Sequence, residues 1–151
     1  MKATIFGLLV LAPASIWGSS SAVSEELQPL SQWLKRPANQ QDPSYSFVRC
    51  AGYYMAIMKY AGARLSNEEK ARVVEVTAEL AFAAAEIRRA KAPSTLPLKE
   101  YVAGDVSRTA DEYGMRMQRN YSLFGDAAAD DSLITGDGQA CKEIVKELSR
   151  R

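Results

Sequence analysis

The chain has 151 residues, enough for one domain with a hydrophobic core of its own. Hydrophobic residues make up 47% of it and charged residues 25%, which is usual for folded soluble domains and unlike disordered chains. The 19 Lys and Arg residues are balanced by 18 Asp and Glu residues, so the overall charge does not favour binding to nucleic acid.

Residues 1–22 have the pattern of a signal peptide. Lys2 supplies the positive start, the apolar run 3–12 is too short to span a bilayer, and Ser-Ser-Ala at 20–22 suits a signal peptidase. We predict cleavage after residue 22, with residues 12–14 as a second candidate site and an uncleaved interfacial anchor as the alternative. Loss of Lys2 leaves 18 basic and 18 acidic residues. With no later membrane-spanning segment expected, the protein is predicted to be exported, periplasmic or secreted.

The mature chain is expected to begin with residues 23–41, a short helix over Glu25–Lys35 followed by a proline-containing loop. The first long helix is predicted to start at Asp42, as N-cap, and to end at Gly62, as C-cap. Its apolar side chains recur at steps of three and four and should face a core: Phe47, Cys50, Ala51, Tyr54, Ile57, Met58 and Ala61.

The second long helix opens with Ser-Asn-Glu-Glu at 66–69, which is the sequence of a capping box, and is predicted to run to about Lys91. The third should extend over about 98–124. Gly104 and Gly114 weaken that helix, so we expect a bend or a close helix contact there.

The last long helix is predicted to begin at Asp130 or Asp131, with a shorter helix from Asp137 as the alternative. Four long helices joined by short loops favour antiparallel neighbours. We therefore predict an all-α domain over residues 42–151, an up-down-up-down four-helix bundle with the short N-terminal helix lying across it.

Cys50 and Cys141 are predicted to form a disulfide, because an exported chain with an even number of cysteines favours one. In the predicted bundle the first and last long helices are antiparallel, which places the two cysteines at similar heights on core-facing stripes. Closing so large a loop should contribute roughly 4–5 kcal/mol. A reactive cysteine is the weaker interpretation, since the chain has no Cys-x-x-Cys motif and no histidine base.

The absence of histidine excludes the usual serine triad, most zinc sites, haem attachment by Cys-x-x-Cys-His and the Glu-x-x-His di-iron motif. No P-loop or Gly-x-Gly-x-x-Gly motif occurs. Three weaker alternatives are calcium at the acidic region 126–137, a carboxylate pair such as Glu75 and Glu79, and Cu(I) at the methionines Met55, Met58, Met115 and Met117. We expect no catalytic residue, metal or cofactor.

Asp137 is a candidate buried charge, because it falls on the apolar stripe of the last helix. We expect it to face Arg116, Arg119 or Asn120 across the last hairpin. One interpretation is an ion pair or a cap near the end of the bundle, and the other is a polar pocket.

Four residues form a candidate interaction surface: Phe82, Arg49, Tyr53 and Tyr60. Phe82 interrupts the charged outer stripe of the second helix, and either the N-terminal segment or a partner should cover it. The other three lie on a flank of the first long helix that is expected to point away from the disulfide. They should either receive the N-terminal segment or contact a partner.

The sequence RCAGYY at 49–54, the spacing from Asp137 to Cys141 and the signal-like start resemble small exported bacterial helical proteins of unknown function. This resemblance implies no activity and no functional residues. We expect a non-enzymatic exported protein that acts through protein–protein contacts, with an unknown partner or as a homodimer. A small-ligand or metal-binding bundle is the alternative, and a carboxylate-dependent enzyme is the second alternative.

Overall fold

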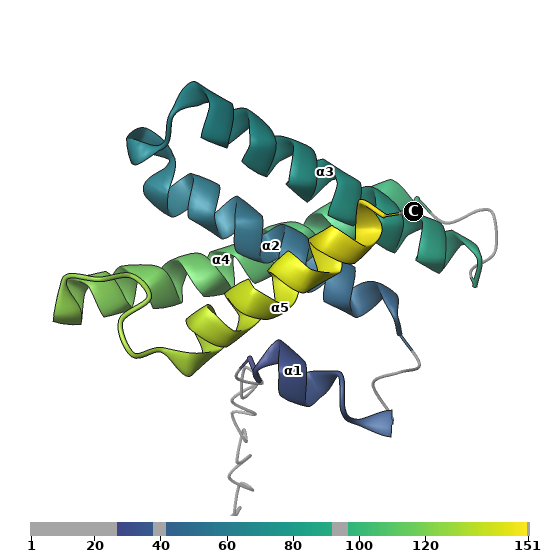
Figure 1. The fold of residues 1–151 in the computed structure, drawn as a ribbon. Helices are drawn as coiled ribbons and strands as arrows, with labels where there is room; N and C mark the ends of the chain where they lie inside the picture. Colours follow the sequence, from purple (N-terminus) through teal and green to yellow (C-terminus); the bar gives the residue numbers. More distant parts are fainter. Residues whose placement is uncertain (1–26, 38–41, 92–96, 151) are drawn as a thin grey trace, which may run out of the picture.

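The computed structural model describes residues 27–37, 42–91 and 97–150, and within these ranges it contains helices and no strand. The predicted signal peptide lies outside the described residues. The described residues form five α-helices, which are labelled in Figure 1, and a short 3₁₀ turn follows the second of them. They are α1 (Leu30–Trp33), α2 (Ser44–Ala61), η2 (Gly62–Arg64), α3 (Asn67–Arg89), α4 (Leu98–Phe124) and α5 (Ser132–Leu148). The prediction of an all-α chain is therefore confirmed.

Side chains predicted to cap helices do so at the starts of α3 and α5, whereas the N-cap residue of α2 is Pro43 and not the predicted Asp42. Asp42 Oδ1 accepts the backbone N–H of Ser44 at 3.1 Å. Ser66 and Glu69 form the reciprocal bonds of a capping box. Asp131 accepts two backbone N–H groups from the first turn of α5. Each cap satisfies donors that the first helical turn leaves without a partner.

Two helix ends differ from the sequence prediction. Gly62 occupies the C-cap position of α2, but its φ of −54° is right-handed and the chain continues directly into η2. The left-handed glycine is Gly125, with a φ of 73°, which ends α4. The short N-terminal helix was predicted over Glu25–Lys35, and in the described part of that range only the four residues of α1 are helical. Leu30 is the one buried residue of this helix, and so short a helix is marginal without packing.

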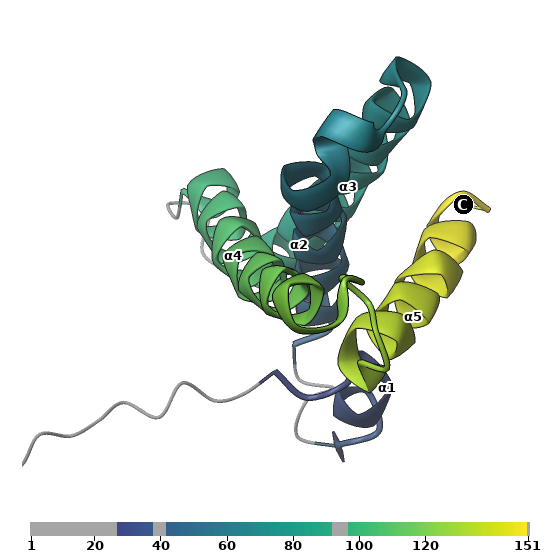
Figure 2. The same ribbon diagram turned by 90° about the vertical axis from the view of Figure 1, so that its left-hand side faces the viewer.

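Helix α2 is the centre of the molecule, with α3 and α4 packed along it. Figures 1 and 2 show α5 crossing the same helix on another side, with α1 against α5. The hydrophobic core therefore surrounds α2. Its buried residues form two clusters, of which the larger contains Leu30, Val48, Cys50, Ala51, Leu80, Ala84, Ala85, Val102, Val106 and Cys141. The smaller contains Ala56, Ala110, Tyr113, Met117, Leu133 and Ile134.

The predicted disulfide joins α2 to α5. Cys50 and Cys141 are both fully buried, their Cα atoms are 5.3 Å apart, and 91 positions separate them in sequence. The bond therefore attaches the last helix to the central one from within the larger core cluster.

The close helix contact involves a glycine other than the two expected. Nothing lies within 4 Å of a Cβ built at Gly104 or Gly114, so the expectation of a close contact there is wrong. A Cβ at Gly52 of α2 would instead lie 2.7 Å from Thr109 Cβ and 3.1 Å from the backbone nitrogen of Ala110. The missing side chain of Gly52 is what allows α4 to approach α2 so closely.

Alanine at this glycine should destabilise the fold, because Thr109 is buried and the backbone of α4 has to move away. We expect Gly52→Ala to lower the free energy of unfolding by about 1–3 kcal/mol. Gly104→Ala is the control and should raise it by roughly 0.5–1 kcal/mol, since helix propensity improves in open space. Urea unfolding measures both, and equal effects of the two variants would contradict the helix contact.

Candidate functional site

A buried cluster of three polar side chains, Arg49, Tyr113 and Asp137, connects α2, α4 and α5. The arginine Nη2 lies 2.5 Å from Asp137 Oδ2, and its Nε lies 3.0 Å from the same oxygen and 2.9 Å from Tyr113 Oη. The hydroxyl of Tyr113 donates to Asp137 Oδ2. The second carboxylate oxygen accepts the backbone N–H of Leu30 at 2.6 Å, which attaches α1 as well.

The charges of this cluster are mutually compensated. Burial opposes the charged form of Arg49, but Tyr113 and Asp137 outweigh it and raise the pKa of the guanidinium. Burial, followed by the nearby carboxylate, raises the pKa of Tyr113, although the arginine opposes this. The phenol therefore stays protonated as a donor and the arginine stays charged at ordinary pH. With every partner inside the fold, the cluster fixes the relative positions of four helices.

The prediction that Arg49 belongs to an interaction surface is wrong. Its side chain is 1% exposed, so it takes no part in a surface. It was expected on a flank of α2 that points away from the disulfide, but its guanidinium bonds the carboxylate of a residue 88 positions later. Asp137 is fully buried, as its place on the apolar stripe predicted. Its charged partner is Arg49 of α2 rather than Arg116, Arg119 or Asn120, and the residue of the last hairpin that bonds to it is Tyr113.

Two of the three residues expected to face Asp137, Arg116 and Asn120, instead bind Asp131 at the corner between α4 and α5, and the third, Arg119, is exposed. Asp131 Oδ2 lies 2.5 Å from Arg116 Nε and accepts a hydrogen bond of 2.9 Å from Asn120 Nδ2. Burial opposes the ionised form, but the bonds from Arg116, Asn120 and the backbone of Ile134 lower the pKa of Asp131. A cavity of about 580 Å³ lies at this corner, and three of its polar lining residues, Arg116, Asn120 and Asp131, are bonded to one another.

A larger groove opens between α3 and α5, above α2. Figure 2 shows these two helices diverging on either side of α2, and the groove between them has a volume of about 700 Å³. We call it the α3–α5 groove. Six of its lining residues are apolar or aromatic: Tyr54, Ile57, Leu65, Val73, Val76 and Val145. Its polar lining consists of Glu69, Arg72, Lys142, Lys146, Ser149 and Arg150.

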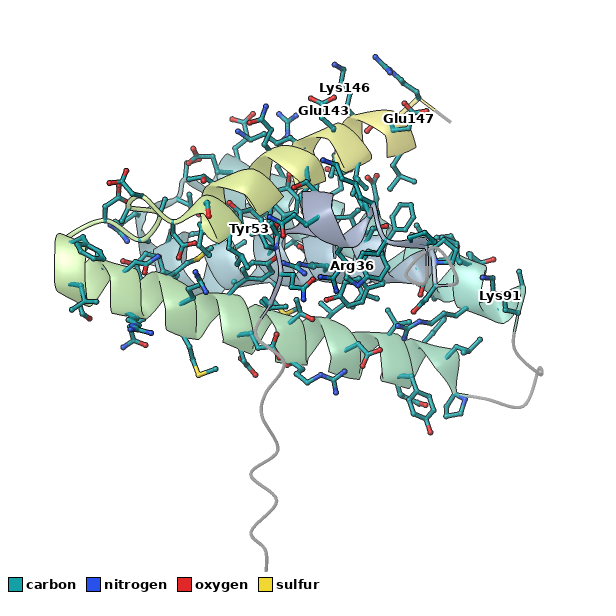
Figure 3. The ribbon with its side chains drawn as sticks, turned by 90° about the horizontal axis from the view of Figure 1, so that it is seen from below. Arg36, Tyr53, Lys91, Glu143, Lys146 and Glu147 are labelled. Atoms are coloured by element: carbon teal, nitrogen blue, oxygen red, sulfur yellow. A yellow bond between two sulfur atoms is a disulfide. The ribbon has the colours of Figure 1, made fainter. Side chains whose placement is uncertain are left out.

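The walls of the groove are positioned by the features described above. Val145 and the lysines belong to the part of α5 that follows Cys141, so the disulfide anchors one wall to α2. The opposite wall is the first half of α3, which the capping box begins. Figure 3 shows Lys146 extending outward from α5, at the edge of the groove. A concave, mainly apolar site with a few polar groups at its edge has the general form of a small-molecule pocket.

Sequence reasoning missed this groove. Lys142, Lys146 and Arg150 recur at steps of four, which puts them on one side of α5, next to Val145. That spacing predicts a basic stripe on α5 from the sequence alone, but it does not predict that Arg72 of α3 lines the same groove. The relative position of α3 and α5 depends on tertiary packing.

The remaining members of the predicted interaction surface are dispersed. Phe82 is 62% exposed on the outer side of α3, so the expectation that the N-terminal segment covers it is wrong. The described part of that segment packs on α5 instead. Tyr53 and Tyr60 are half-buried, and Figure 3 places Tyr53 among the helices beside α5. Tyr53 packs edge-on against Tyr113, with ring centroids 5.2 Å apart.

Within residues 27–37, 42–91 and 97–150, no helix is both long and apolar enough to cross a bilayer. In the same ranges, no three cysteine or carboxylate side chains group as metal ligands would. Glu75 and Glu79, considered above as a carboxylate pair, are both exposed on α3.

A scan against protein-family models, a search of curated proteins and a search of solved structures each found no match to this chain. Its function is therefore argued from its own geometry.

Proposed function

We propose that the chain is an exported, non-enzymatic helical protein that acts by binding, and that it binds through the α3–α5 groove. The signal-like residues 1–22 support export, and a disulfide is compatible with an oxidising compartment. We also propose that the four long helices are an up-down-up-down bundle with one splayed member, α5. The short connections between successive helices support this arrangement.

The observation that carries the proposal is the apolar floor of the groove. Tyr54 and Ile57 of α2, Val73 and Val76 of α3, and Val145 of α5 converge on one open volume of about 700 Å³. Volumes of this size are typical of ligand pockets. Three different helices contribute to the floor, so its shape is set by the fold rather than by a loop.

The test is binding of a neutral aliphatic probe, 1-decanol, followed by amide chemical-shift changes in the mature protein. We expect the shifts to concentrate on the floor of the groove. Val145→Trp fills the groove from its α5 wall and should weaken binding at least tenfold, because the indole occupies the volume that the aliphatic chain of 1-decanol needs.

The matched control is Val74→Trp, the same substitution on the outer side of α3, where the valine is 60% exposed. It should leave the affinity for 1-decanol unchanged. Equal loss in both variants, or shifts scattered over the whole surface, would show that the groove is not the binding site.

A second candidate function is a contact between proteins through the outer side of α3, where Val74 and Phe82 lie two turns apart and are both largely exposed. If a second copy covers them, light scattering of the mature chain should give the mass of a dimer. Phe82→Glu should then give a monomer, whereas Tyr101→Glu, at an equally exposed aromatic of α4, should not. A monomeric unsubstituted protein contradicts this candidate.

A further inference from the structure

We propose that the ligand of the α3–α5 groove is a single-chain anionic amphiphile, an aliphatic chain that ends in a carboxylate. This inference rests on the proposed function, because it specifies what the groove binds. It follows from the distribution of charge around the apolar floor.

Basic side chains gather at the edge of the groove although the chain as a whole is balanced. Arg72 comes from α3, and Lys142, Lys146 and Arg150 come from α5 and the turn after it. Glu69 is the one carboxylate that lines the groove. Four basic residues against one acidic residue contrast with 19 against 18 in the whole sequence. The local field therefore favours an anion.

The single carboxylate is already engaged elsewhere. Glu69 Oε2 accepts the backbone N–H of Ser66 at 2.8 Å as part of the capping box. This bond to Ser66 lowers the pKa of Glu69. Its charge is thus held at the start of α3.

The basic groups are available to a ligand. Within the described residues, neither Arg72 nor Lys142 forms an ion pair with a carboxylate. Lys146 lies 3.8 Å from Glu143, and Arg150 lies 3.3 Å from Glu147. Both members of each of these two ion pairs are exposed, and exposed ion pairs contribute little energy, so a ligand can compete for the basic groups.

The apolar floor of the groove suits the aliphatic part of an amphiphile. Its valines and Ile57 have only aliphatic surface to offer, and Tyr54, which lines the same groove as Arg72, adds a phenol. Burial raises the pKa of Tyr54, although the charge of Arg72 opposes this, so the phenol remains a hydrogen-bond donor at neutral pH. An aliphatic chain can cover the valines while its carboxylate meets the basic edge and this donor.

The experiment compares three probes that share a ten-carbon chain: decanoate, 1-decanol and decyltrimethylammonium. Each is titrated calorimetrically into the mature protein below its critical micelle concentration. We expect decanoate to bind roughly tenfold more tightly than 1-decanol, as two weak charge contacts together would give. The cationic probe should bind more weakly than either. The advantage of decanoate should shrink at high salt, because exposed charges are screened.

The variant that tests the edge is the double substitution Lys142→Glu with Lys146→Glu. It should lower the affinity for decanoate far more than the affinity for 1-decanol, and so remove the advantage of decanoate. The control, Lys99→Glu with Arg119→Glu, makes the same change in net charge at exposed positions of α4 and should preserve the advantage. Because all four side chains are exposed, unfolding midpoints close to that of the unsubstituted protein verify that both variants fold.

The outcomes separate this inference from the proposed function. If 1-decanol and decanoate bind equally well, or if both double variants lose the same affinity, the anionic ligand is wrong and the groove remains a binding site. If none of the three probes binds, the proposed function fails as well. Co-sedimentation with phosphatidylglycerol vesicles, in a protein that does not bind decanoate, would instead identify a membrane surface as the partner and overturn the inference.

Discussion

Replacing Asp137 with alanine should lower the free energy of unfolding by about 3–5 kcal/mol, because the substitution leaves Arg49 charged, buried and without its carboxylate. The backbone N–H of Leu30 and the hydroxyl of Tyr113 lose their acceptor at the same time. Urea unfolding followed by circular dichroism measures the change. With a typical domain stability of roughly 5–15 kcal/mol, the variant is expected to be close to its unfolding threshold.

Two controls separate a buried pair from charge removal in general. Glu86→Ala breaks an ion pair with Arg89 whose members are about half exposed, and it should change stability by less than about 1 kcal/mol. Arg49→Met combined with Asp137→Leu removes both buried charges and should recover a large part of the loss. A double variant as unstable as Asp137→Ala would show that the hydrogen bonds to Asp137 matter more than the uncompensated charge.

Removal of the disulfide should have an effect of similar size. The bond closes a loop of 91 positions, and the chain-entropy model assigns such a loop roughly 4–5 kcal/mol of stabilisation. Cys50→Ala with Cys141→Ala should therefore unfold at a much lower urea concentration than the oxidised protein. Reduction of the unsubstituted protein should lower the midpoint to about the same value.

The oxidised state itself is checked by mass. Under non-reducing conditions the mature chain should weigh two hydrogens less than its sequence requires, and it should not react with thiol reagents until it has been unfolded and reduced. Free thiols in protein taken directly from its compartment would contradict both the bond and the expected location.

Local features of the chain were predictable because their causes are local. The capping box at Ser66 and the cap at Asp131 depend on a few neighbouring residues, and α4 has the predicted bounds. The pairing of Cys50 with Cys141 was predictable because only two cysteines exist.

Features that depend on distant contacts were not predictable to the same degree. Asp137 was recognised as buried from its place in a stripe, but its partner Arg49 lies in another helix and was assigned to the surface. The same limit applies to Phe82, whose exposure depends on where the N-terminal segment packs. The α3–α5 groove exists only through the divergence of two helices, which no single stretch of sequence encodes.

The hydrogen bonds of Asp137 also bear on the order in which this chain folds. Its carboxylate accepts hydrogen bonds from Leu30, 107 positions earlier, and from Arg49, 88 positions earlier, so both bonds require distant parts of the chain to come together. Contacts of such high sequence separation form late and slow folding, because the entropy of loop closure is lost before they form. Until the 17 residues of α5 have been synthesised, Arg49 has no buried carboxylate to meet. Arg49 and Tyr113 therefore gain the carboxylate that compensates them only when α5 packs against α2 and α4.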